Sequence, residues 1–156
     1  PSKAAQIYVE IDARFRAGEI QAERFIGLKR DGACPSLPTR GAALRGTEWR
    51  VVEVDGERPV YEDWRQRPRL TLDDRGRYGG SGGCNSISGA YELDADGLRF
   101  APAATTLIGC APSVAAAEKR FIDALAAVRE AHIAGTTLDL IDGAGKRRLR
   151  LEARGR

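Results

Sequence analysis

Short turn signals built on glycine and aspartate recur along most of this chain and limit the length of any regular element between them. They lie at residues 55–56, 74–76, 94–97, 134–135 and 142–145. The segments between them alternate apolar and polar residues, which indicates strands with one buried face. Glycine turns of two to five residues join antiparallel neighbours. The sequence therefore predicts a meander of short antiparallel strands.

One segment departs from this two-residue period. Residues 114–130 are rich in alanine, and their larger apolar side chains recur at helical spacing: Val114, Phe121, Ile122, Leu125 and Val128. Pro112 and Ser113 precede it, and Ser113 is expected to cap the helix. The opposite, polar face is expected to carry Glu118, Lys119 and Asp123. The predicted fold class is therefore α+β, a curved antiparallel sheet or partial barrel with one packed helix at about residues 113–130.

The first forty residues form a separate pattern. Residues 7–16 alternate, a turn follows at residues 17–19, and a second apolar segment runs through Phe25 and Leu28, which together predict a β-hairpin. A linker-like stretch with two prolines ends at Gly41. We expect residues 1–42 to be an extension or the end of a preceding domain, residues 43–153 to be the main domain, and residues 154–156 to be a basic tail.

The charge distribution argues against a nucleic-acid groove. The chain has a net charge of +3, and residues 143–156 contain six basic residues and one acidic residue. The rest of the chain is therefore slightly acidic. A solvated strand face that leads into the tail explains this basic run better than nucleic-acid binding does. No apolar run is long enough to span a bilayer.

The reactive residue types are sparse. His132 is the only histidine, and the cysteines Cys34, Cys84 and Cys110 contain no Cys-x-x-Cys pair, so no zinc site, redox centre or serine triad is expected. No cofactor is expected either. One disulfide and one leftover thiol in an oxidising compartment fit three cysteines best.

Glycines dominate residues 77–91. No Gly-Lys-Ser/Thr follows them and no helix is predicted to begin there, so a phosphate-binding loop is not expected. Strands flank the segment on both sides, and the glycines therefore predict close backbone packing, bulges or sharp curvature.

Four stretches of the sequence follow one another in order along the chain: Leu44-Arg45-Gly46-Thr47-Glu48-Trp49, the turn at residues 55–56, Gly83-Cys84-Asn85-Ser86-Ile87-Ser88-Gly89-Ala90-Tyr91, and Ala104-Thr105-Thr106-Leu107-Ile108-Gly109-Cys110. Together they resemble the META/HslJ-like domain. The resemblance covers about residues 43–153. It departs from the family pattern at residues 107–109, where many relatives have a basic residue. Residues 25–28 with Cys34 resemble, more weakly, the end of an NlpE-like lipoprotein domain, in which case Cys34 is expected to be a free thiol.

The resemblance implies a curved antiparallel sheet with a packed helix. It also implies a bacterial envelope location, often as a lipoprotein, and a link to stress tolerance, namely to heat shock and to novobiocin resistance. It implies no enzymatic activity. It also implies a disulfide between Cys84 and Cys110, which would stabilise the fold by roughly 3 kcal/mol.

Two functions follow as hypotheses. The first is a non-enzymatic periplasmic module that binds or scaffolds an unknown envelope partner, with membrane attachment only through a lipid anchor outside this chain. The second is a carrier of a small apolar ligand between sheet and helix. Six residues are candidates for the ligand or partner surface: Trp49, Trp64, Asn85, Phe100, Thr106 and Phe121. The aromatic residues among them have a simpler interpretation, in which they fill the core and Trp64 folds back to cap the barrel end.

Overall fold

A computed structural model describes residues 41–154 of the chain, which belong to one compact unit. Its strands are β1 (Trp49–Val54), β2 (Arg69–Leu72), β3 (Arg77–Ser81), β4 (Ser86–Asp94), β5 (Gly97–Phe100), β6 (Ala104–Thr105), β7 (Val128–Ala134), β8 (Thr137–Asp142) and β9 (Arg147–Ala153). A short 3-10 helix, η2 (Trp64–Gln66), lies between β1 and β2, and the helix α2 (Pro112–Ala127) lies between β6 and β7. The predicted N-terminal hairpin and Cys34 lie outside the described residues.

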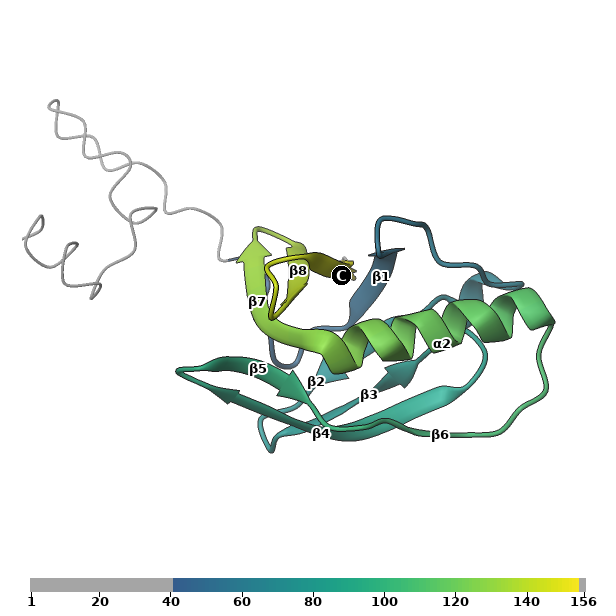
Figure 1. Cartoon of the computed structure of the whole chain (residues 1–156), viewed down its shortest axis with the longest axis horizontal. Helices are drawn as coiled ribbons and strands as arrows, with labels where there is room; N and C mark the ends of the chain where they lie inside the picture. Colours follow the sequence, from purple (N-terminus) through teal and green to yellow (C-terminus); the bar gives the residue numbers. More distant parts are fainter. Residues whose placement is uncertain (1–40, 155–156) are drawn as a thin grey trace, which may run out of the picture. The chain divides into compact units, whose positions relative to one another are not determined.

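The strands form one antiparallel sheet in the order β5-β4-β3-β2-β1-β9-β8-β7, with β6 paired to β4 (Figure 1). The last strand returns beside the first, because Val51 pairs with Leu151 of β9. The two end strands, β5 and β7, also contact each other. The sheet is therefore a nearly closed barrel, and the predicted α+β class with a curved antiparallel sheet and one helix is confirmed.

The glycine-rich segment provides the close backbone packing that its sequence predicts. Gly80 of β3 pairs with Leu70 of β2, and a Cβ atom at Gly80 would collide with the Arg69 carbonyl oxygen. The ring of Tyr78 covers Gly89 of β4, where a Cβ atom would lie 2.6 Å from the tyrosine hydroxyl oxygen. Side chains at these positions would separate the strands. The glycines therefore allow β2, β3 and β4 to curve tightly over the core.

The helix differs from its prediction at both ends. It begins at Pro112 after an Ala111 cap that makes no side-chain hydrogen bond, so Ser113 lies inside the helix and does not cap it. Proline suits the first helical position because its φ is already helical and its missing N–H has no partner to lose. At the other end the chain enters β7 at Val128. Val128 satisfies both the helical spacing and the strand alternation, and this explains why the sequence placed the end near residue 130.

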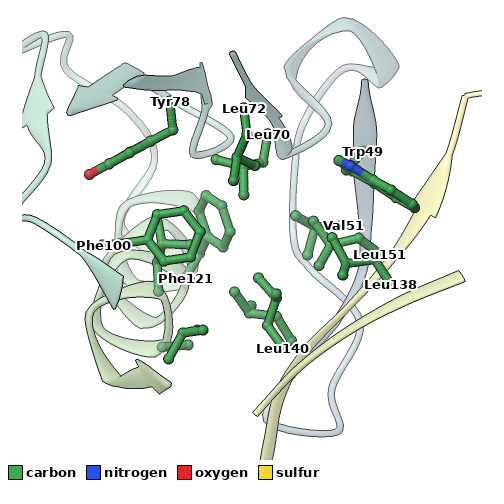
Figure 2. Close-up of a cluster of buried hydrophobic side chains, with 14 of the residues drawn as sticks. Trp49, Val51, Leu70, Leu72, Tyr78, Phe100, Phe121, Leu138, Leu140 and Leu151 are labelled. Carbon is green, nitrogen blue, oxygen red and sulfur yellow. The ribbon is translucent and has the colours of Figure 1, made fainter. Parts of the chain in front are cut away.

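A single hydrophobic core fills the barrel beneath the helix (Figure 2). Alternate residues of the strands point inward, and α2 packs against β1, β5, β8 and β9 with Phe121, Ala124 and Leu125. The fully buried large side chains are Trp49, Phe121, Leu70, Leu72, Leu98, Leu125, Leu138, Leu140, Leu149, Leu151, Val51 and Val128. Each such side chain contributes about 1.5–3 kcal/mol through burial.

Cross-strand ion pairs cover the outer face of β1, β9 and β8. Arg150 holds Asp139 in a two-pronged pair at 2.7 and 2.8 Å, and Arg147 bonds Glu53 at 2.7 Å. Arg148 reaches Asp55 at 2.5 Å. The basic residues of β9, Arg147, Arg148 and Arg150, thus lie on an outer strand face, as the sequence predicts for this part of the basic run. In the part of the chain that the structure describes, no helix has the length and apolar character needed to cross a bilayer.

Candidate functional site

A disulfide joins the two cysteines that the family resemblance pairs. Cys84 and Cys110 are bonded, with their Cα atoms 6.1 Å apart and 26 residues between them in sequence. Cys84 belongs to the loop of residues 82–85 between β3 and β4, and Cys110 lies just before α2. The bond therefore ties the glycine-rich strands to the segment that enters the helix, and the predicted pairing is confirmed.

Asn85 connects the same two segments through its side chain. Its Oδ1 accepts hydrogen bonds from the Thr106 hydroxyl at 2.9 Å and from the Ile108 backbone N–H at 2.7 Å. The Thr106 Oγ1 in turn accepts a bond from the Ser86 N–H at 3.1 Å. Asn85 is only 9% exposed. These bonds hold the segment before the helix against the start of β4, so Asn85 and Thr106 support the loop and their polar groups are occupied.

Glu118 of α2 completes this cluster, although the sequence placed it on the polar face of the helix. It is 7% exposed, and its carboxylate accepts hydrogen bonds from the Cys84 N–H at 3.0 Å, the Asn85 N–H at 2.6 Å and the Asn85 amide at 2.7 Å. The side chain also lies against Gly82, where a Cβ atom would be 2.6 Å from a carboxylate oxygen. A buried carboxylate is tolerated where donors surround it. We name Cys84, Asn85, Thr106, Cys110 and Glu118 the Glu118 cluster.

The Glu118 cluster has the features of a structural lock. Its carboxylate, amide and hydroxyl groups are all engaged in hydrogen bonds, and its two sulfurs are bonded to each other. The position of Glu118 does leave a signal in the sequence, since it follows Val114 by four residues and precedes Phe121 by three. Both neighbours are buried, so helical spacing puts Glu118 on the edge of the apolar stripe.

The four candidate aromatic residues are divided between core and surface. Trp49 and Phe121 are fully buried and Phe100 is 7% exposed, all within the core, so they fill it as the simpler interpretation predicts (Figure 2). The Trp49 indole N–H donates to the Leu44 carbonyl at 3.0 Å. Trp64, however, is 71% exposed in η2. The indole therefore does not cap the barrel end, and the 3-10 turn that carries it is capped by Asp63, which accepts a hydrogen bond from the Arg65 N–H.

Trp64 borders a surface pocket that the sequence did not predict. The pocket has a volume of about 280 Å³. Its lining consists of Glu48, Arg50, Tyr61, Trp64, Arg65, Arg67, Arg69 and Arg154, which we name the arginine pocket. The residues come from the start of β1, the β1–β2 connection, the start of β2 and the end of the chain that follows β9. Five arginines and two aromatic side chains thus share one pocket with a single carboxylate.

The arginine pocket was not predicted because net charge was summed over long segments of the sequence. Residues 1–142 have a slightly acidic total, which averages away the local arginines. A local signal exists, because Arg65, Arg67 and Arg69 alternate directly after Trp64, from the β1–β2 connection into the start of β2. The structure then adds Arg50 and Arg154, which are more than a hundred residues apart in sequence.

A second pocket adjoins the first and shares Tyr61 and Arg67 with it. Its remaining lining mixes charges: Val52, Glu53, Arg58, Pro59, Arg150 and Glu152. On the neighbouring strand, the hydrogen bond from Arg150 is the main cause that lowers the pKa of Asp139, and charge from Arg150, Arg147 and His132 adds to it. The pKa of Arg150 is raised by the same bond. This face is therefore internally neutralised, in contrast to the arginine pocket.

We next considered side chains that could bind a metal ion or transfer a proton. Within residues 41–154, no three histidine, cysteine or acidic side chains gather in a way that would hold a metal ion. His132 lies in β7 and is exposed, with Glu130 3.1 Å away. Neither residue lines the arginine pocket.

Comparisons with known proteins agree with this fold. A structure of a Burkholderia xenovorans protein determined by NMR has a TM-score of 0.56 at 20% identity, over 83% of this chain and 100% of that one. A second NMR structure has a TM-score of 0.55 at 22% identity, over 69% and 89% of the two chains. A DUF4847 family protein from Bacteroides vulgatus has a TM-score of 0.50 at 15% identity, over 72% and 96%. No curated protein matches the chain.

The family model for the META domain matches residues 42–155. That range contains every strand described above, the helix, the Glu118 cluster and the arginine pocket. The chain therefore belongs to the META domain family.

Proposed function

We propose that this chain is a non-enzymatic binding or scaffolding module of the bacterial cell envelope. In the full-length protein it follows an NlpE-like domain and is held at the membrane by a lipid anchor, and it contributes to stress tolerance. The observation that carries the proposal is the Cys84–Cys110 disulfide. Structural disulfides persist in oxidising compartments such as the periplasm and are rare in the cytosol.

The surroundings of the disulfide support this assignment. Both cysteines are half-buried, and the Glu118 carboxylate and the Asn85 amide fix the backbone beside them. A reactive thiol pair needs an exposed, electropositive environment that stabilises the thiolate. Here the Cys84 N–H donates to the Glu118 carboxylate, so the side chain beside the bond is acidic rather than basic. The bond is therefore suited to stabilise the domain rather than to exchange electrons.

The solvent-exposed polar and aromatic side chains support a binding role. The core is filled and the Glu118 cluster is internally satisfied, whereas Trp64 and several arginines face solvent. Burial of Trp49, Phe100 and Phe121 in the core removes the observation on which an apolar-ligand carrier would rest. We therefore place the recognition surface on the outside of the barrel.

The compartment is tested in the native host with the full-length gene and an epitope at its C-terminus. Cells are treated with an alkylating reagent before lysis, and peptides are analysed by mass spectrometry without reduction. We expect a linked Cys84–Cys110 peptide and recovery of the protein in the envelope fraction. Alkylated thiols at both positions, together with recovery in the cytosolic fraction, would refute the proposal.

The stress role is tested with a deletion strain grown at elevated temperature and with novobiocin. We expect reduced survival that the wild-type gene restores and that a variant without the lipid-anchor cysteine of its own leader restores less well. Equal survival of deletion and wild-type strains under both conditions would argue against a role in stress tolerance.

A further inference from the structure

The arginine pocket concentrates positive charge that its own carboxylate does not compensate. Glu48 lies 3.9 Å from Arg50 and 3.4 Å from Arg154 and is shared between them. Among residues 41–154, no carboxylate lies within 4.0 Å of the guanidinium groups of Arg65, Arg67 or Arg69. The β9 arginines on the same sheet, Arg147, Arg148 and Arg150, all have such partners. The arginine pocket is therefore the place where this surface lacks an anion.

Backbone contacts keep the uncompensated arginines together. An Arg69 guanidinium nitrogen donates to the Arg65 carbonyl oxygen at 3.1 Å, which fixes Arg69 beside η2. The Nε of Arg67 is buried and has no hydrogen-bond partner among the described residues. This arginine is thus partly desolvated without compensation, which costs free energy. An anion at its remaining nitrogens would offset that cost and the mutual repulsion of the three charges.

The residue types indicate which anion fits. Guanidinium groups are planar forks that bind phosphate oxygens in pairs, and several in one pocket favour a dianionic phosphate over a single carboxylate. Beside them, Trp64 is 71% exposed and Tyr61 is 37% exposed. The Arg65 guanidinium lies 5.3 Å from the Trp64 ring centre and so keeps the indole next to the charges. Exposed aromatic faces of this kind offer a flat surface for a ring.

The dimensions and the neighbouring charges limit the ligand. A volume of about 280 Å³ holds one ring with one phosphate. An extended polyanion that continued into the adjoining pocket would meet Glu53 and Glu152 there as well as Arg58, and Arg150 of that pocket is already paired with Asp139. This favours a compact ligand over a nucleic-acid strand.

We propose that the arginine pocket binds a phosphate group carried on a sugar ring, with Arg65, Arg67 and Arg69 at the phosphate and Trp64 against the ring. The phosphate is part of a soluble sugar phosphate or of a lipid headgroup. The proposal gives the binding module of the preceding section a ligand class and rests on it for its cellular meaning. The binding itself is measured in vitro, so its failure leaves the compartment assignment unaffected.

The test uses the full 156-residue chain labelled with ¹⁵N. Its two tryptophans give two indole N–H signals, and Trp49, buried and bonded to Leu44, is the internal control. The Trp64→Phe variant identifies the Trp64 signal. The probes are glucose 1-phosphate, methyl glucoside and inorganic phosphate, each at concentrations up to about 10 mM. We expect glucose 1-phosphate to move the Trp64 signal in a saturable way, inorganic phosphate to bind about tenfold more weakly, and methyl glucoside to have no effect.

Arginine variants locate the phosphate. Arg67→Gln and Arg65→Gln should each weaken glucose 1-phosphate binding about tenfold, and raising the salt concentration from 50 to 300 mM should weaken wild-type binding several-fold. Arg75→Gln, which removes the same charge from the exposed β2–β3 turn, is the matched control and should change binding less than twofold. Arg65 is exposed, so its variant stays informative if Arg67→Gln does not fold.

A further experiment distinguishes a lipid headgroup from a soluble sugar phosphate as the source of the phosphate. Phosphatidylcholine vesicles with lipid A, whose phosphates are carried on sugar rings, are compared with phosphatidylcholine vesicles given the same charge by phosphatidylglycerol. Selective binding to the lipid A vesicles supports a lipid headgroup as the source. No saturable shift of the Trp64 signal with any phosphate probe, or equal weakening by Arg75→Gln, would overturn the proposal. Tighter binding of a ten-residue oligothymidylate than of glucose 1-phosphate would replace it with nucleic-acid binding.

Discussion

Glu118 is an acidic side chain on a helix whose neighbours in space are backbone N–H groups of a distant loop. Hydrophobic periodicity assigns such a residue to solvent, because the pattern contains no information about donors contributed by residues 33 or 34 positions away. The loop in turn has the glycine at Gly82 that leaves room for the carboxylate. The buried carboxylate of Glu118 is explained by the N–H groups of the loop, and Gly82 in the loop is explained by the space that the carboxylate needs.

Loss of the Glu118 carboxylate should destabilise the domain strongly. In Glu118→Ala, the N–H groups of Cys84 and Asn85 lose their acceptor inside the protein, and the Asn85 amide keeps only its contact with the Cys84 sulfur. Leaving buried donors without partners costs about 1–3 kcal/mol, so we expect a decrease of about 3 kcal/mol in the free energy of unfolding. Urea denaturation followed by circular dichroism measures it. Asp123→Ala, on the exposed side of the same helix, is the control and should change stability by less than about 0.5 kcal/mol.

Gly80 shows the same dependence on a neighbour that sequence does not reveal. A Cβ atom there would meet backbone atoms of Arg69 and Leu70, and backbone cannot move aside as a flexible side chain does. Gly80→Ala should therefore lower the free energy of unfolding by about 3 kcal/mol through overpacking, with loss of the β2–β3 pairing. Gly109→Ala is the comparison, because nothing lies within 4 Å of its Cβ position. Equal stability of the two variants in thermal melts would contradict this account.

At the scale of elements, β8, β9 and β1 are joined by charge as well as by backbone hydrogen bonds. Asp139 and Arg150 are paired in the strand register, and their side chains form two hydrogen bonds on the outer face. Antiparallel register brings opposite charges face to face in this way. The Asp139–Arg150 ion pair therefore contributes to the stability of the sheet by an amount that depends on pH.

Protonation of Asp139 in acid should lower the free energy of unfolding. Its pKa is lowered from 3.8 in the folded protein, so the folded state favours the ionised form. The contribution is present above pH 4 and is lost as the pH falls through the lowered folded-state value. Asp139→Asn should decrease stability at pH 7 by about 1 kcal/mol and flatten the decline of stability below pH 4. Urea midpoints from pH 7 to pH 2 measure this, and an unchanged acid profile would contradict it.

The end of α2 shows why element boundaries were harder to predict than element types. The helix and six of the strand segments, those of β1, β2, β4, β5, β8 and β9, carry clear periodicities, and most of their alternating apolar residues lie in the core. Val128, by contrast, is buried whichever element it joins. The choice is made by β8, whose Asp142 pairs with Val128 and draws the chain into the sheet. Information from the partner strand is absent from any local window.

For the whole molecule, the fold followed from sequence more completely than the candidate surface did. Turn spacing and alternation predict the meander because they are local properties of the sequence, and the family resemblance predicts the disulfide because both cysteines lie in the stretches that carry the resemblance. The arginine pocket depends on Arg50 and Arg154, which meet only because β9 pairs with β1. Such a surface can be predicted only when the pairing of the first and last strands is known.

The described unit should fold without the residues that precede it. Its core draws on side chains between Ala42 and Ala153, and its first and last strands pair with each other, so the barrel supplies its own closure. A fragment of residues 41–156 is therefore expected to unfold in one cooperative step, with a free energy of unfolding of about 5–15 kcal/mol. Urea denaturation followed by tryptophan fluorescence and by circular dichroism should give the same midpoint, since Trp49 reports on the core and the strands on the sheet. A fragment without dispersed amide signals in NMR, next to a full chain that has them, would show that the first forty residues are required for the barrel to form.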